Sequence, residues 1–257
     1  MRAKPLIGRT ILVTRPESPD GALEKRLRAL GARVVCAPVI RIAPPSSYAG
    51  LDAALRGLGR YDAAAFASAR AVESVFARAR ALGLGRLKAP PKVFAVGPQT
   101  ALALRRRGWP ATAPKDYRAQ ALATIMRGVK GRRIFLPRAQ EGGKLLAREL
   151  RGRGAAVDAV AAYRTLPDRG GLPVIRRLAR AGRIDAVAFT SGSAVEQLMS
   201  LLPAALRHGL FRKAMAASIG PVTSAALRRW RPDTVVEARR ATAASLSLAI
   251  ARHFRRD

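Results

Sequence analysis

Cysteine, histidine and aromatic residues are all scarce in this chain of 257 residues. The single cysteine, Cys36, excludes an internal disulfide and a cysteine-rich metal site. The two histidines, His208 and His253, stand far apart without acidic neighbours at ligand spacing, which argues against a histidine-based metal site. Aromatic residues make up only 5%, which weakens the case for binding single-stranded nucleic acid by base stacking.

Long apolar runs and the common nucleotide-binding motifs are missing as well. No apolar stretch is long enough to span a bilayer, and the basic start of the chain lacks the apolar core of a secretion signal, so we expect a cytoplasmic protein. The patterns G-x-G-x-x-G, G-x-x-x-x-G-K-S/T and G-x-S-x-G do not occur. Thr14-Arg15 and Pro137-Arg138 stand where a receiver domain would carry acidic magnesium ligands.

Acidic residues are strongly outnumbered. Sixteen of them oppose 48 lysines and arginines, which gives a net charge of +32. Such a charge attracts polyanions, whether nucleic acid, an anionic membrane or a small polyacid. The alternative is that most arginines are ordinary solvated charges on helix surfaces. Their dispersal over all predicted helices argues against nucleic-acid binding as the main function, although sequence-independent binding at low salt is expected.

An internal repeat with an offset of 123 residues organises the chain. The matched positions are Gly8 and Gly131, Arg15 and Arg138, Gly31 and Gly154, Arg41 and Arg164, Asp62 and Asp185, Ser68 and Ser191, 71–73 and 194–196, Gly97 and Gly220, and Thr100 and Thr223. Because one register holds through so many pairs, the chain consists of two homologous units.

Each unit alternates short β-prone runs with helical patterns, which is typical of parallel sheets covered by helices on both faces. The predicted strands are 10–14, 33–36, 62–67, 93–96, 133–136, 156–160, 185–190 and 215–219. The predicted helices are 19–30, 70–82, 98–107, 142–152, 193–201 and 221–229. Several strands are apolar throughout, as buried parallel strands are. The predicted fold class is α/β, with two flavodoxin-like or Rossmann-like parallel sheets.

Small hydroxyl residues and glycines follow the predicted strands, and ligands of open α/β sheets bind beyond the carboxyl ends of strands. Ser191-Gly192-Ser193 opens a helix there, with Ser193 as the predicted N-cap and Glu196 completing an S-x-x-E capping box. The stretches 97–100 and 220–223 open two further helices with proline at the first helical position.

Helix N-termini attract anions through free backbone N–H groups and the helix dipole. Arg15 and Arg138 are predicted to follow the first strand of each unit, at the same sheet edge. The alternative is that all these residues form ordinary caps and turns. Their agreement in two copies favours a shared anion-binding cleft.

The segments "ILVTRPE", "FASARAVE", "VGPQTA", "AVAAYRTLP", "FTSGSAV" and "SIGPVTSAAL" resemble uroporphyrinogen-III synthase, in the right order over essentially the whole chain. The resemblance implies two flavodoxin-like domains, residues 1–37 with 167–257 and residues 43–161, joined by a two-stranded linker at 37–43 and 161–167. The repeat alone would place a simpler boundary near 124–130. Ala67, Ala69 and Gly192 depart from residues that are common in the family.

The implied activity is ring closure of hydroxymethylbilane with inversion of ring D, giving uroporphyrinogen III and water without a cofactor or metal. Tyr163 matches the family's candidate general acid. A phenol suits that role because it keeps its proton at neutral pH. The alternative is that Tyr163 is an aromatic residue of the linker that only packs against its neighbours. The repeat partner of Tyr163 is Ile40. The predicted substrate-binding residues are Arg15, Ser68, Arg70, Gly97, Thr100, Arg138, Ser191, Gly192, Ser193, Gly220 and Thr223.

We expect a monomer that takes its small-molecule substrate from hydroxymethylbilane synthase and binds neither a membrane nor a specific nucleic acid. Two alternatives stay open at this point. In the first, the chain is a non-enzymatic two-domain protein that binds an anionic tetrapyrrole. In the second, it is a protein that associates with nucleic acid through its positive charge.

Overall fold

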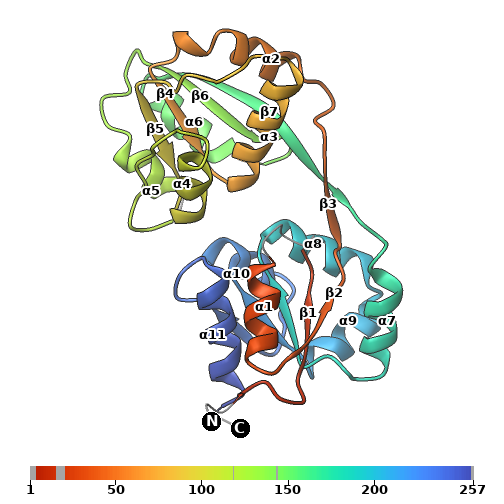
Figure 1. The fold of residues 1–257 in the computed structure, drawn as a ribbon. Coiled ribbons are helices and arrows are strands. Elements are labelled where there is room, and N and C mark those ends of the chain that lie inside the picture. The colour runs from red at the N-terminus through yellow and green to blue at the C-terminus, as the bar shows by residue number, and fades with distance from the viewer. Residues whose placement is uncertain (1–3, 16–20, 118, 143, 256–257) are drawn as a thin grey trace. The chain divides into compact units, whose positions relative to one another are not determined.

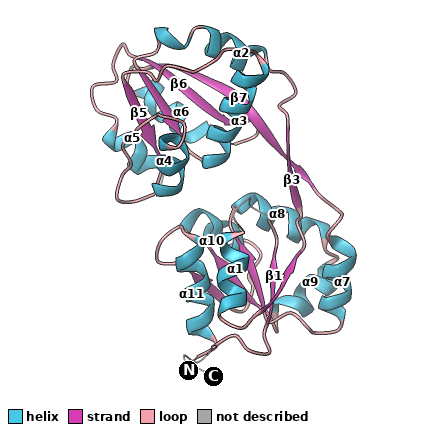
Figure 2. Ribbon diagram, in the orientation of Figure 1, coloured by secondary structure: helices cyan, strands magenta, loops and turns pink. Residues whose placement is uncertain are grey.

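The computed structural model describes residues 4–15, 21–117, 119–142 and 144–255. The chain forms two compact units, Met1–Arg41 with Leu166–Asp257 (unit 1) and Ile42–Thr165 (unit 2). Two five-stranded sheets form the framework, and helices cover both faces of each (Figures 1 and 2). The predicted α/β class with two parallel-dominated sheets is confirmed.

The sheet of unit 1 joins the two ends of the chain. Its order is β10-β9-β8-β1-β2, and its neighbouring strands are parallel. The strands are β1 (Thr10–Val13), β2 (Arg33–Cys36), β8 (Ala186–Phe189), β9 (Met215–Ser218) and β10 (Val235–Glu237). Strands β1, β8 and β9 are buried along their whole length, because their apolar side chains face helices on both sides.

Two separate cores hold the helices of unit 1 to its sheet. One face carries α1 (Ala22–Ala29) and α11 (Ala243–His253), whose leucines pack with Ile11 and Val13. The other face carries α7 (Leu172–Arg180), α8 (Gly192–Leu201), α9 (Ala204–Phe211) and α10 (Pro221–Arg228).

The sheet of unit 2 has the order β3-β7-β6-β4-β5. Its strands are β3 (Ile40–Ala43), β4 (Ala63–Phe66), β5 (Lys92–Ala95), β6 (Arg133–Ala139) and β7 (Ala156–Pro167). One face carries α2 (Ala49–Arg56), a short 3-10 helix (Leu58–Arg60), α3 (Ala69–Ala81) and α4 (Pro98–Arg105). The other face carries α5 (Ala119–Ile125) and α6 (Lys144–Gly152).

The repeat predicted from the sequence is visible in the structure. After the shift of 123 residues, the pair β1·β2 and the pair β6·β7 share one register. The matched aspartates also do the same work: Asp185 Oδ2 accepts from the Thr10 amide and Asp62 Oδ2 from the Arg133 amide, both at 2.8 Å. Each thus fixes the start of a central strand, which explains why both units keep an aspartate there.

Each predicted strand and helix has a counterpart within a few residues, although positions 19 and 20 of the helix predicted at 19–30 and position 143 of the helix predicted at 142–152 lie outside the described residues. Strands β6 and β7 are longer than predicted: they stay paired as far as Ala139 and Tyr163, and β7 also has β3 as a neighbour and ends at Pro167. Arg138 therefore lies inside a strand and not after it, which corrects the prediction. Strand β3 falls within the linker predicted at 37–43. The elements that the sequence reading missed are α2, the 3-10 helix, α5, α7, α9, α11 and β10.

Candidate functional site

The predicted site residues of unit 2 lie along one edge of the sheet, near the carboxyl ends of β6, β4 and β5 and beside the residue of β7 that pairs with the end of β6. Tyr163 is in β7, Arg138 near the end of β6, Ser68 after β4 and Gly97 after β5, and β7-β6-β4-β5 is their order in the sheet. Since parallel strands end at one edge, these residues form a row along it.

Ser68 and Tyr163 are in direct contact. The Ser68 Oγ and Tyr163 Oη atoms are 3.3 Å apart. Ser68 is the N-cap of α3, with extended backbone angles, and its Oγ accepts a hydrogen bond from the Ala71 amide at 3.1 Å. Tyr163 is half-buried and packs against the core under α3. The structure therefore brings together the predicted acid and one predicted substrate contact.

The side chain of Arg138 is hydrogen-bonded to backbone carbonyls of the residues that follow it. Its Nη1 donates to the carbonyls of Ala139, Gln140 and Gly142 at 2.8–2.9 Å. Gln140 adds further hydrogen bonds to this segment. Its backbone N–H donates to the Tyr163 carbonyl, and its side-chain Oε1 accepts from the backbone N–H and the hydroxyl of Ser46. Sequence reasoning missed Gln140, whose partners lie far away along the chain. Arg138 shapes the edge of the sheet beside Tyr163.

The remaining predicted residues of unit 2 differ in accessibility. Thr100, in the first turn of α4, is only 4% exposed. A Cβ at Gly97 would lie 3.2 Å from the ring of Tyr117, so glycine allows that ring to pack against the helix start. The guanidinium of Arg70 lies 2.6 Å from Glu73 on its own helix and is partly exposed.

In unit 1 the edge between β1 and β8 carries Arg15 and the start of α8. Arg15 lies 3.4 Å from Glu24, a buried carboxylate in the first turn of α1 that sequence reasoning missed. The N-cap of α8 is Ser191, whose Oγ accepts from the Ala194 amide at 3.2 Å. The cap predicted at Ser193 is therefore wrong.

The reason is that α8 begins one residue earlier than predicted, which leaves Ser193 exposed inside the first turn. Its Oγ lies 3.1 Å from that of Ser191. Glu196 closes no capping box, because its carboxylate accepts from Arg229 and from the Trp230 indole. Gly192 has room around it: an added Cβ would meet nothing closer than 3.5 Å.

The start of α10 completes the predicted residues of unit 1. Gly220 precedes Pro221 at the first helical position, and Thr223 is 3% exposed in the first turn. Ser218 holds this turn, since its Oγ donates to the Gly220 carbonyl at 2.8 Å and accepts from the Gly220 amide at 3.2 Å. The predicted residues thus form two groups, each at the carboxyl edge of its own sheet.

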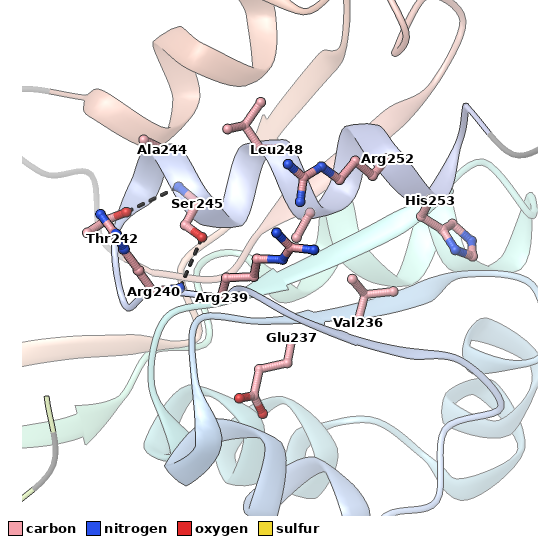
Figure 3. A pocket seen from close by; sticks show the side chains of 11 residues that line it. Val236, Glu237, Arg239, Arg240, Thr242, Ala244, Ser245, Leu248, Arg252 and His253 are labelled. Atoms are coloured by element: carbon pink, nitrogen blue, oxygen red, sulfur yellow. Dashed lines mark hydrogen bonds between the residues drawn. The ribbon is translucent and has the colours of Figure 1, made fainter. Parts of the chain in front are cut away.

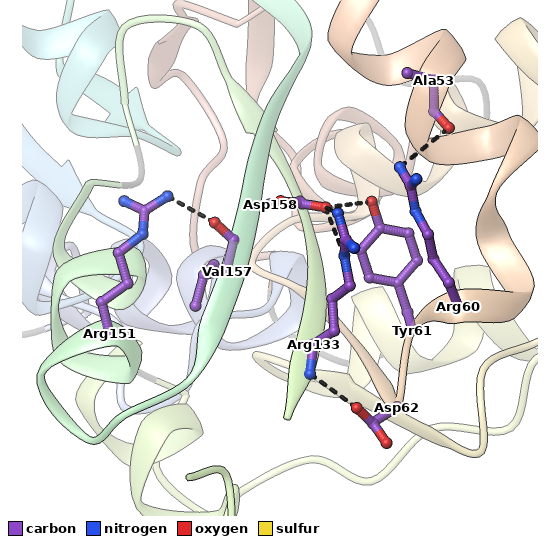
Figure 4. Close-up of polar contacts among 8 residues, drawn as sticks. All are labelled: Ala53, Arg60, Tyr61, Asp62, Arg133, Arg151, Val157 and Asp158. Atoms are coloured by element: carbon purple, nitrogen blue, oxygen red, sulfur yellow. Dashed lines mark hydrogen bonds and ion pairs between the residues drawn. The ribbon is translucent and has the colours of Figure 1, made fainter. Parts of the chain in front are cut away.

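A polar network stands at the opposite, amino-terminal side of the unit 2 sheet (Figure 4). The Tyr61 hydroxyl donates to Asp158 Oδ2 at 2.7 Å, and the Arg133 guanidinium reaches the same oxygen at 3.0 Å. Burial and the bond to Asp158 raise the pKa of Tyr61. Burial would also raise the pKa of Asp158, but the hydrogen bonds from Tyr61 and Arg133 outweigh it and leave that pKa lowered.

Two basic pockets contain almost none of the predicted residues. A pocket of about 570 Å³ lies between β10 and α11, where Arg239 and Arg252 point into the same space while Glu237 turns away (Figure 3). A pocket of about 520 Å³ on unit 2 is lined by Arg138 together with Lys144, Arg148 and Arg151. Both suit loose association with anions.

The described part of the chain carries no sign of a metal cluster or of a membrane-spanning helix. Among these residues no group of three or more His, Cys, Asp or Glu side chains could hold a metal ion. None of their helices combines the length and apolar character required to cross a membrane.

Comparison with known proteins decides the family. The family model for uroporphyrinogen-III synthase HemD matches residues 21–247. The chain is also 32% identical over 261 residues to the uroporphyrinogen-III synthase of Synechococcus elongatus, with 97% of both chains covered. The chain belongs to the uroporphyrinogen-III synthase family.

Other relatives agree with this assignment. The uroporphyrinogen-III synthase of Escherichia coli is 32% identical over 202 residues, which cover 76% of this chain and 80% of that one. A crystal structure of a mutant uroporphyrinogen III synthase from Thermus thermophilus superposes with a TM-score of 0.69 at 25% identity, covering 97% of this chain and all of that one. The family resemblance, the lyase class and a place in porphyrin biosynthesis are confirmed, and a non-enzymatic binder is not favoured.

Proposed function

We propose that the chain converts hydroxymethylbilane to uroporphyrinogen III and water, with Tyr163 as the general acid. The observation that carries the role of Tyr163 is its place at the carboxyl edge of the unit 2 sheet, in contact with Ser68 at a helix N-terminus. The substrate's hydroxyl group leaves more easily as water than as hydroxide, so a positioned phenol accelerates its loss.

The substrate carries eight carboxylates, as four acetate and four propionate arms. The helix starts at Ser68, Gly97, Ser191 and Gly220 offer backbone N–H groups to such arms. The proposed substrate contacts are Arg15, Arg70, Gly97, Thr100, Arg138, Ser191, Gly192, Ser193, Gly220 and Thr223. No cofactor takes part in this proposal, and much of the catalysis is correct folding of a linear substrate.

Arg138 and the two threonines define what this proposal requires. The Nη1 of Arg138 is held by three carbonyls and its Nε is buried, so a substrate carboxylate would meet its Nη2. Thr100 and Thr223 are almost fully buried, so a contact with the substrate requires that the start of each helix becomes more exposed than it is in this structure.

The proposal also includes the domain limits 1–37 with 167–257 and 43–161, a two-stranded linker at 37–43 and 161–167, a monomeric state and a cytoplasmic location. The pairing of β3 with β7 in one sheet supports the linker. The basic pockets support only weak, salt-sensitive association with polyanions such as nucleic acid.

The deciding experiment incubates the purified protein with freshly generated hydroxymethylbilane, oxidises the products and separates uroporphyrin III from uroporphyrin I by chromatography. Mostly isomer III is expected from the wild type. Tyr163→Phe should lower kcat by about 100-fold, at the lower end of the usual effect of a general acid. Isomer I at the rate of buffer alone, from folded protein, would contradict the proposed activity.

A further inference from the structure

We propose that Ser68 is a positioning residue for Tyr163, and that it donates a hydrogen bond to the phenol oxygen so that the phenol proton faces the substrate. This inference rests on the proposed role of Tyr163 as the acid. It replaces the prediction that Ser68 contacts the substrate directly.

The hydroxyl of Ser68 is left with a proton to donate. A serine hydroxyl has one donor and two acceptor positions. One acceptor position is taken by the Ala71 amide at 3.1 Å, as part of the cap of α3. That bond also fixes the direction of the side chain. The phenol oxygen of Tyr163, 3.3 Å away, lies within reach of the remaining proton.

Tyr163 is held from its backbone side as well. Its carbonyl accepts from the Gln140 amide at 2.8 Å, and the residue is paired with Ala139 of β6. Its ring packs against the core of unit 2. The main freedom left to the phenol is rotation of its O–H bond, and a hydrogen bond from Ser68 selects the rotation that turns the phenol proton away from Ser68.

The proton balance shows why this direction favours the reaction. The carbon–oxygen bond of the hydroxymethyl group breaks, both electrons leave with the oxygen, and the oxygen takes the Tyr163 proton to become water. The tetrapyrrole chain is left as a cation and Tyr163 as a phenolate. The hydrogen bond from Ser68 then ends on a charged oxygen and strengthens, so it stabilises the transition state more than the ground state. The proton released when the ring closes restores the phenol.

Comparison of the two repeat units distinguishes the capping role of Ser68 from its proposed positioning role. Ser191 caps α8 in the same way, with its Oγ 3.2 Å from the Ala194 amide. The position that matches Tyr163 is Ile40, which has no hydroxyl, and Ser191 Oγ contacts Ser193 instead. The cap is therefore common to both units, whereas the contact with a phenol belongs to unit 2.

The test is a double-mutant cycle on kcat and KM for uroporphyrinogen III formation, with Ser68→Ala, Tyr163→Phe and the double variant. Ser68→Ala should lower kcat about tenfold, the effect of one ordinary hydrogen bond, and change KM less than about twofold. In the Tyr163→Phe background the same change should have almost no further effect on kcat. Ser68→Thr keeps the hydroxyl and should restore kcat to within about threefold.

Two kinetic results would overturn the inference. A tenfold loss that persists in the Tyr163→Phe background would show that Ser68 acts independently of the phenol. A raised KM with unchanged kcat would return Ser68 to the substrate contacts. Unfolding of each variant, followed by the fluorescence of Trp109 in the unit 2 core, separates these effects from the loss of the cap.

A spectroscopic measurement without substrate tests the hydrogen bond between Ser68 and Tyr163 independently of the proposed activity. The tyrosine doublet in the Raman spectrum reports whether a phenol oxygen accepts or donates a hydrogen bond. We expect the difference between wild type and Tyr163→Phe to show an accepting phenol, and Ser68→Ala to abolish that signature. A donating phenol in the wild type would refute the inference, whichever isomer the enzyme makes.

Discussion

Replacing Tyr61 by phenylalanine should destabilise unit 2 without touching the proposed site. Tyr61 is 2% exposed, and its hydroxyl donates to Asp158 Oδ2 at 2.7 Å. The change removes one hydrogen bond to a charged group and keeps the ring, which packs 5.5 Å from Phe135. A bond of this kind contributes about 2 kcal/mol, so the urea midpoint should fall by about 1 M at an m-value of about 2 kcal/mol/M.

The chain offers both a reporter and a control for this experiment. Its two tryptophans divide between the units, with Trp109 in the core of unit 2 and Trp230 beside that of unit 1. Unfolding of unit 2 is therefore followed by Trp109 fluorescence in a Trp230→Phe background. Tyr48→Phe is the matched control, because the Tyr48 hydroxyl makes no hydrogen bond to a described residue and only its ring meets Arg78.

The pH dependence gives a second check. The pKa of Asp158 is lowered in the folded state, so its contribution is present above the ordinary aspartate pKa and is lost as pH falls through the lowered value. The difference between wild type and Tyr61→Phe should therefore shrink in acid. Equal midpoints for wild type, Tyr61→Phe and Tyr48→Phe at neutral pH would refute the reasoning.

The remaining predictions concern helix caps and turns. Ser191→Ala should lower the stability of unit 1, read from Trp230, by about 1 kcal/mol, and Ser68→Ala should cost unit 2 about the same, since their capping distances are 3.2 and 3.1 Å. A loss confined to one of the two units would contradict this equivalence. Gly8→Ala should cost unit 1 about 1–2 kcal/mol, because φ is +78° and nothing lies near an added Cβ. Gly31→Ala should cost clearly more, because φ is +98° and its Cβ would lie 2.9 Å from the Ile7 side chain. Equal costs in a urea titration would count against the steric argument.

Much of the fold could be predicted because the sequence contains the same pattern of strands and helices twice. Asp62 and Asp185 match in the sequence and bind equivalent amides in the structure. Among the missed helices, α9 is short, contains alanine and glycine, and has weak apolar spacing. In α7, by contrast, Leu172, Ile175 and Leu178 recur at helical spacing and are buried, so the sequence did carry a signal for that helix. The three-residue strand β10 is too short to give a pattern of its own. It forms because β9 offers a neighbouring edge.

The site was predictable at the level of sheet edges but not of contacts. Arg138 could be placed at the edge, yet nothing local predicts that three carbonyls would hold it. Ser193 satisfied the capping pattern, but Ser191 adopts the extended backbone that a cap requires. The contact between Ser68 and Tyr163 joins residues 95 positions apart that are not repeat partners, so only the folded chain reveals it.

The crossed connectivity affects the order in which the protein assembles during synthesis. Unit 2 is continuous in sequence, whereas β1 of unit 1 must wait for β8 to cover its second edge. The stretch of about 150 residues from Cys36 to Ala186 takes about 8–30 s to translate at the usual rates. Nascent chains stalled once residue 165 has left the ribosome should protect residues 42–165 from protease and leave residues 4–36 open to cleavage. The first strand to be made is thus one of the last to gain both of its neighbours in the sheet.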